Sequence, residues 1–104
     1  METITAITAL AALAQESRLN IFRLLVQAGS AGISVGEIKE MTGIPGSSLS
    51  FHLKELSHAG LIHARQESRF IYYKADYAVM NALLAFLTEN CCGGDASCKT
   101  ECCE

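Results

Sequence analysis

In the middle of the chain the spacing of the apolar residues changes from a helical to an alternating pattern, and this change restricts the fold more than any other feature. Ser34 and Glu37 have the spacing of a capping box and predict a short helix over 34–41. A glycine-containing turn at 42–45 leads into a second predicted helix over 47–59, whose leucines recur at helical spacing. These two helices and their tight turn are typical of a helix-turn-helix.

The alternating pattern that follows predicts a β-hairpin. β-Branched and aromatic residues alternate with polar ones over 61–66 and 69–74, and Glu67-Ser68 is the predicted turn. Because two strands alone are only marginally stable in water, this hairpin must pack against helices. A helix-turn-helix followed by a two-stranded ribbon is a winged helix-turn-helix, and the second helix of such a unit enters the major groove of DNA.

Further helices are predicted on both sides of this unit, over 3–13 and 17–28 before it and over 77–89 after it, the last capped by Asp76. The fold class is therefore mostly α with one hairpin, in the order of four helices, two strands and a fifth helix. We expect residues 1–90 to form one winged-helix domain for DNA binding and dimerisation. The apolar residues of the first and last helices exceed what one small core needs, which indicates a homodimer.

The composition excludes several protein classes. The chain has 104 residues, half of them hydrophobic, with 18% charged residues and one proline, which indicates a single folded domain. No apolar run is long enough to cross a membrane. Glu2 stands where a secretory signal has a positive charge, so we expect a cytoplasmic protein. A phosphate-binding loop, a catalytic histidine pair and a Cys-x-x-Cys motif at a helix start are all missing from the sequence, so we expect no enzyme.

The outward side of the predicted second helix and the hairpin supply candidate DNA contacts. Serine hydroxyls can bind phosphates or base edges, and an exposed aromatic ring can contact a thymine methyl group. The alternative is that the serines only cap the helix and that the ring packs under the hairpin. Residues 47–74 carry a net charge of +2 and the rest of the chain −5, which places positive charge where phosphates would lie. The candidate residues are Ser47, Ser48, Ser50, Phe51, Lys54, Arg65 and Arg69.

Three segments resemble the ArsR family of winged-helix repressors. Ser-Leu-Ser-Phe-His-Leu-Lys-Glu-Leu at 48–56 and Ala-Gly-Leu-Ile at 59–62 are similar to the family's recognition helix, and Arg-Phe-Ile-Tyr-Tyr-Lys at 69–74 is similar to its wing. The resemblance covers residues 12–89. It implies a metal- or metalloid-responsive repressor that binds double-stranded operator DNA as a homodimer formed by its first and last helices, with no organic cofactor and no membrane partner.

The histidines offer no metal site of the kinds the family uses. His52 is expected to be a hydrogen-bonded structural residue, while His58 and His63 are isolated from carboxylates and thiols at ligand spacing. The resemblance places one family site on a Cys-x-Cys segment, but residues 34–41 contain no cysteine. Another family site uses histidines and carboxylates of the last helices, and 76–89 contains no histidine.

All five cysteines lie in the last fourteen residues, and we interpret 91–104 as a cysteine-rich inducer-binding tail. Cysteines that staple a core are distributed through it, so this cluster indicates soft-metal or redox chemistry instead. The arrangement of Cys91, Cys92 and Cys98 resembles the C-terminal site of a group of arsenic-responsive family members, which implies that As(III), or Sb(III), is bound by these three thiolates. Soft thiophilic centres prefer such sulfur ligands.

Several alternatives to this site remain. Cys102 and Cys103 could capture and transfer the metalloid, replace the third ligand, or form a disulfide-prone end. The protein could instead be a zinc-, cadmium- or redox-responsive repressor, although the Cys-x2-Cys knuckles typical of structural zinc are missing from the sequence. It could also sequester soft metals without binding a specific DNA. The main hypothesis is a repressor whose apo dimer binds a palindromic operator and releases it when the metalloid binds.

Overall fold

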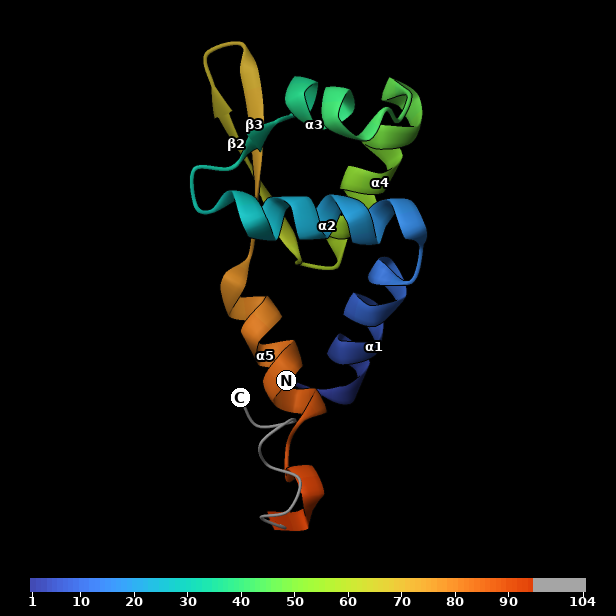
Figure 1. Ribbon diagram of the computed structural model, residues 1–104, viewed down its shortest axis with the longest axis vertical. Helices are drawn as coiled ribbons and strands as arrows, with labels where there is room; N and C mark the ends of the chain where they lie inside the picture. The colour runs from blue at the N-terminus through green and yellow to red at the C-terminus, as the bar shows by residue number, and fades with distance from the viewer. Residues whose placement is uncertain (95–104) are drawn as a thin grey trace.

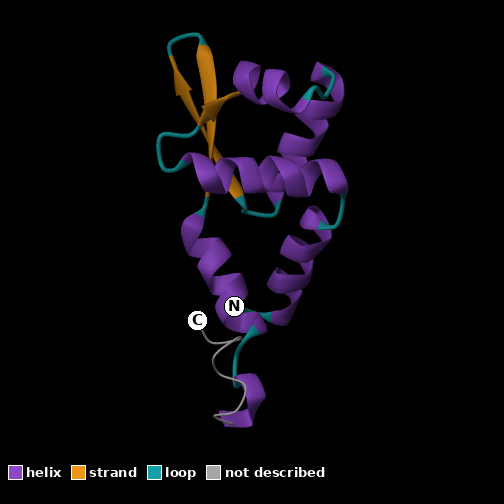
Figure 2. Cartoon of the chain, in the orientation of Figure 1, coloured by secondary structure: helices purple, strands orange, loops and turns teal. Residues whose placement is uncertain are grey.

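The structure is a computed structural model that describes residues 1–94, and within them it has five α-helices and a three-stranded antiparallel sheet (Figures 1 and 2). The order of helices and strands confirms the predicted winged helix-turn-helix. The elements are α1 (Thr3–Leu13), α2 (Glu16–Ala28), β1 (Ile33–Ser34), α3 (Val35–Thr42), α4 (Gly46–His58), β2 (Ile62–Glu67), β3 (Phe70–Ala75), α5 (Tyr77–Leu87) and the short 3-10 segment η1 (Cys91–Gly94).

Local capping interactions explain where the helices of the DNA-binding unit begin and end. The Ser34 hydroxyl accepts a hydrogen bond from the Glu37 N–H (3.2 Å), and the Glu37 carboxylate accepts one from the Ser34 N–H (3.3 Å), which confirms the capping box. Gly43 adopts a left-handed conformation and ends α3 by donating its N–H to the Lys39 carbonyl. Asp76 caps α5, as predicted, by accepting from the Val79 N–H at 3.0 Å.

A third strand, β1, was not predicted. Its two residues pair antiparallel with β3, where Ile33 lies opposite Tyr73, and the strand order of the sheet is β1-β3-β2. Two residues are too few to show an alternating pattern, so only the position of β3 makes this segment a strand. The chain enters β1 through Gly32, where an added Cβ would lie 2.6 Å from the Tyr73 carbonyl oxygen.

The hairpin turn and the end of the last helix differ from the prediction. The turn lies at Ser68-Arg69 rather than at Glu67-Ser68, because Glu67 still pairs with Phe70, and both strands begin and end one residue later than predicted. Ser68 takes a positive φ (57°) in this turn. The helix predicted over 77–89 ends at Leu87. Thr88 leaves helical geometry, and its hydroxyl donates to the Leu84 carbonyl (2.8 Å).

The core lies in the part of the molecule formed by α2, α3, α4 and the sheet, while α1 and α5 extend from it and converge at their far ends (Figure 1). Small Ala6 and Ala9 are the buried residues of α1, and Leu83 is the buried residue of α5. Among the described residues no helix is long and apolar enough to span a membrane. The largest fully buried side chains are Ile21, Leu25, Ile38, Leu49, Leu56, Leu61 and Ile62.

Candidate DNA interface and the cysteine-bearing end of the chain

The helix α4 has one buried side and one exposed side. Leu49, Leu53 and Leu56 anchor the helix in the core. Residues three and four positions apart on a helix share a face, so the outward residues between positions 47 and 54 form one continuous stripe. The structure therefore brings the predicted contacts of this helix together, and their binding to DNA stays a prediction. The exposed residues of this stripe are Ser47, Ser48, Ser50, Phe51 and Lys54.

Phe51 is the unusual residue of this stripe because its side chain is large, apolar and 56% exposed. Within residues 1–94 the ring contact of Phe51 is an edge-on contact with His52, at a centroid distance of 5.9 Å. The alternative that Phe51 is buried beneath the hairpin is therefore wrong. The side chain is presented to whatever binds this face of α4.

The two arginines of the wing have different environments. Arg65 lies on β2, where its guanidinium pairs with Glu67 (3.1 Å), donates to the Ala31 carbonyl (3.2 Å) and lies 5.1 Å from the centroid of the Tyr72 ring. Arg69 lies at the hairpin turn and forms no ion pair with another residue of the described chain. Part of the charge of Arg65 is thus balanced within the protein, whereas Arg69 presents its charge at the tip of the wing.

Arg18 connects α1, α2 and the recognition helix. Its Nε donates to the Ala12 carbonyl at 2.8 Å, and its Nη1 lies 3.5 Å from Nδ1 of His52 on α4. His52 is half-buried, so its expected role as a hydrogen-bonded structural residue fits the structure. Through Arg18, α4 is linked to the end of α1.

The expectation that His63 is isolated from carboxylates is wrong. Its Nε2 lies 2.6 Å from Oδ2 of Asp76, which joins β2 to the start of α5. The hairpin register places His63 opposite Lys74, and Asp76 follows two residues later. Spacing along the sequence does not show such a cross-strand neighbour. The Val79 N–H, followed by the hydrogen bond from His63, lowers the pKa of the Asp76 carboxyl below its ordinary value of 3.8.

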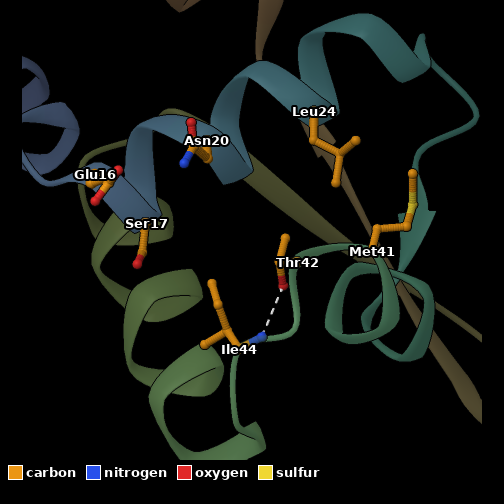
Figure 3. Close-up of a pocket in the computed structure, with 7 residues that line it drawn as sticks. All are labelled: Glu16, Ser17, Asn20, Leu24, Met41, Thr42 and Ile44. Atoms are coloured by element: carbon orange, nitrogen blue, oxygen red, sulfur yellow. Dashed lines mark hydrogen bonds between the residues drawn. The ribbon is translucent and has the colours of Figure 1, made fainter.

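A cavity of about 420 Å³, which the sequence did not indicate, lies between α2 and the turn of the helix-turn-helix (Figure 3). The hydroxyl of Thr42 makes two hydrogen bonds within the protein: it accepts from the Ile44 N–H (3.4 Å) and donates to the Ile38 carbonyl (2.7 Å). A carboxylate is the only charged group of the lining, so the cavity is unsuited to an anion. The lining residues are Glu16, Ser17, Asn20, Leu24, Met41, Thr42 and Ile44.

The first two cysteines follow α5 closely. The Cys91 N–H donates to the Thr88 carbonyl at 2.9 Å, and the Sγ atoms of Cys91 and Cys92 lie 3.5 Å apart. The other predicted ligands, Cys98, Cys102 and Cys103, lie outside the described residues, as does most of the predicted tail 91–104. Within residues 1–94 no three histidine, cysteine or acidic side chains converge to hold a metal ion.

The first and last helices carry apolar residues that the core of one chain leaves uncovered. Ile4 and Ile7 of α1 are 76% and 58% exposed, and Leu84 and Leu87 of α5 are both more than half exposed. An apolar groove of about 270 Å³ continues this surface between α2 and α5. Uncovered apolar surface of this extent is typical of a protein–protein interface.

The chain is similar to known transcriptional regulators. A family model described as a helix-turn-helix domain matches residues 13–65. The HTH-type transcriptional regulator YgaV of Escherichia coli is 34% identical over 83 residues, which are 80% of this chain and 82% of that protein. The transcriptional activator HlyU of Vibrio cholerae is 32% identical over 82 residues, which are 79% of this chain and 73% of that protein.

Solved structures show the same architecture. An ArsR-like transcriptional regulator from Rhodococcus sp. RHA1 has a TM-score of 0.73 and 25% identity, covering 84% of this chain and 78% of its own. The Mb0332 fragment of Mycobacterium bovis is described as a homodimeric winged helix-turn-helix DNA-binding domain, with a TM-score of 0.65, 31% identity and coverage of 83% and 80%. A protein described as a possible transcriptional regulator for arsenical resistance has a TM-score of 0.67, 29% identity and coverage of 76% and 79%.

Proposed function

Because the chain belongs to the ArsR-like family of winged helix-turn-helix transcriptional regulators, we propose that it is a homodimeric repressor that leaves its operator when As(III) or Sb(III) binds the cysteines after α5. The observation that carries this proposal is the position of Cys91 and Cys92, four and five residues beyond the end of α5. They follow directly in the chain a helix whose apolar side is uncovered. In this proposal a ligand bound there acts on the end of α5, and so on the surface that we assign to dimerisation.

DNA binding rests on the exposed stripe of α4 and on Arg69 at the wing tip. In a twofold-symmetric dimer the two copies of α4 enter successive major grooves about 34 Å apart, which requires a near-palindromic operator. Lys54 and Arg69 supply charge for phosphates, and the serines supply hydroxyls that can approach the backbone or base edges. Specificity for one sequence over random DNA at about 0.15 M salt would separate this function from soft-metal sequestration.

Dimerisation through α1 and α5 accounts for the exposed side chains of Ile4, Ile7, Leu84 and Leu87. Each of these side chains would lose contact with water in the dimer, which stabilises it by about 1.5–3 kcal/mol for full burial of such a residue. The homodimeric description of the Mycobacterium bovis neighbour supports a dimer. The proposed dimer therefore uses the surface that the core of one chain leaves open.

The ligand chemistry supports a thiophilic inducer. Metal–sulfur bonds of about 2.3 Å allow one atom to join two sulfurs up to roughly 4.6 Å apart, and the Sγ atoms of Cys91 and Cys92 are 3.5 Å apart. Cys98 is the proposed third ligand, with Cys102 and Cys103 as further thiols. The sulfurs must be reduced before they bind, and the loss of thiol protons makes the affinity depend on pH. The description of one structural neighbour as a regulator for arsenical resistance also supports this choice.

Release of the operator follows from linkage between the two sites. Changing the operator-bound fraction from 99% to 1% requires that the metalloid bind the two conformations with affinities that differ by about 5.5 kcal/mol. Operator DNA must weaken metalloid binding by the same factor. A smaller difference would give partial induction.

The test is fluorescence anisotropy of labelled operator DNA with protein kept reduced by a phosphine, because thiol reductants bind arsenite themselves. Arsenite should release wild-type protein, whereas Cys91→Ser and Cys92→Ser proteins should stay bound. Cys103→Ser is the matched control and should still respond. If arsenite leaves the wild-type complex intact, or if a chain truncated after Asn90 still responds, the metalloid proposal is wrong.

Thiol oxidation is a second candidate signal, because all five cysteines gather in residues 91–104 and clustered thiols oxidise readily. Two thiols would give up two protons and two electrons to peroxide, forming one disulfide and two waters. In the same assay, release by peroxide with no effect of arsenite on the reduced protein would favour this signal. Release by arsenite alone would exclude it.

A further inference from the structure

Phe51 occupies the centre of the exposed stripe of α4. Ser47 and Ser48 lie four and three residues before it, and Lys54 lies three residues after it, so all of them share its face. The ring is the sixth residue of the helix and 56% exposed, although water-exposed aromatic carbon contributes nothing to the core. In a helix-turn-helix the base edges are met by the N-terminal part of the recognition helix, which is where Phe51 stands.

The major groove contains one apolar group that a phenyl ring can contact, the C5-methyl of thymine. The other groups at the groove edge are hydrogen-bond donors and acceptors. A phenyl ring placed against those groups removes their water without replacing its hydrogen bonds, which weakens binding. Phe51 therefore favours thymine in two ways, because it contacts the methyl group and disfavours the edges of the other bases.

We propose that Phe51 is a specificity-determining residue that reads the methyl group of one thymine in each operator half-site. This inference rests on the proposed function, since it assumes that α4 enters the major groove. The neighbouring hydroxyls and the Lys54 ammonium contact phosphates or adjacent edges and set the position of the ring. Among the described residues, Phe51 is the exposed residue of this stripe that has no hydrogen-bonding side chain.

The expected effect is modest but measurable. Burying one methyl group against the ring corresponds to about a fourfold gain in affinity at one half-site. Two half-sites give about a fifteenfold gain for a dimer if they act independently.

The experiment begins by selecting an operator from random DNA with the full-length reduced protein. Each thymine of that operator is then replaced by deoxyuridine, which removes only the methyl group. We expect one position in each half-site where the replacement weakens wild-type binding about fourfold. Phe51→Ala should bind the unmodified operator more weakly and should lose the dependence on that methyl group.

Lys54→Ala is the matched control on the same face. It should weaken binding to all sequences and lower the salt dependence, while the effect of deoxyuridine stays unchanged. The inference is overturned if deoxyuridine changes wild-type binding at no position, or if Phe51→Ala keeps the same dependence. If the selection yields no preferred sequence, the proposed function fails instead, so the two failures are distinguishable.

Discussion

Replacing Gly32 by alanine would test how β1 and the wing are held together. The Cβ of alanine at this position would lie 2.6 Å from the carbonyl oxygen of Tyr73 and 3.2 Å from its carbon. These atoms belong to β3, the central strand, so they cannot withdraw without disturbing the pairing of β1 or β2. Gly32 also has a φ of +79°, which side-chain-bearing residues rarely adopt.

Gly60→Ala is the control for the backbone conformation alone. Gly60 has nearly the same φ, +78°, and an added Cβ would have nothing within 4 Å. Forcing a side chain into this region costs about 1–2 kcal/mol. Gly32→Ala should cost the same amount plus about 1–3 kcal/mol for the overlap with Tyr73. In a domain of this size each 1 kcal/mol lowers Tm by roughly 4–8 °C.

The two variants should be compared by circular dichroism melting at one protein concentration, because dimerisation makes Tm depend on concentration. We expect both variants to melt below wild type, and Gly32→Ala to melt at least about 4 °C below Gly60→Ala. Equal melting temperatures would show that the close approach of Gly32 to β3 does not constrain the fold. The reasoning would then be refuted even if both variants were destabilised.

Three more predictions concern the contacts that join the elements. Asp76→Ala should destabilise the protein by about 1 kcal/mol at pH 7, because α5 loses its cap. Asp76→Asn is the control and should be less destabilised, because its side-chain oxygen can still cap the helix. Because the pKa of Asp76 is lowered in the folded protein, the ionised carboxylate stabilises the fold above pH 3.8, and this stabilisation is lost as the pH falls below that value. Denaturant titrations should therefore show that the difference in unfolding free energy between wild type and Asp76→Ala becomes smaller below pH 3.8. Ile7→Glu and Leu84→Glu should shift the protein to monomer in analytical ultracentrifugation, and a dimer of unchanged affinity would exclude this interface. Arg18→Ala should weaken operator binding in the anisotropy assay because α4 loses its contact with Arg18 through His52, and unchanged binding would show that this contact does not position α4.

Local signals explain which parts of the fold could be predicted from the sequence. The capping box of Ser34 and Glu37 and the cap of Asp76 involve residues only three positions apart, so the sequence contains both partners side by side. The spacing of Leu49, Leu53 and Leu56 likewise identifies the buried side of α4 and leaves its opposite side as the candidate DNA surface. Each of these features lies within one helix and its cap, so the local sequence is enough to predict it.

The features that were missed depend on residues far apart in the chain. His63 and Asp76 are 13 residues apart and meet because of the hairpin register, and Arg18 and His52 are 34 residues apart. β1 is a strand only because β3 lies beside it. The apolar repeat of α1 was evident in the sequence, but the packing decides that Ala6 and Ala9 are buried while the larger residues are exposed. Small residues on the inner side allow α1 to approach the core closely.

The attachment of α5 suggests how binding at the cysteines would act on the wing. The first turn of α5 is fixed to the rest of the protein, since Asp76 pairs with His63 of β2 and the Tyr77 hydroxyl donates to the Val26 carbonyl of α2 at 2.9 Å. The opposite end of the helix has an exposed apolar side and leads to Cys91 and Cys92. A ligand that draws these sulfurs together would therefore act on α5 as one body, which is attached to the rest of the protein at its first turn. Because that turn is joined to β2, the proposed inducer site and the wing share one rigid connection, and a change in dimer geometry would be accompanied by a change in the position of the wing.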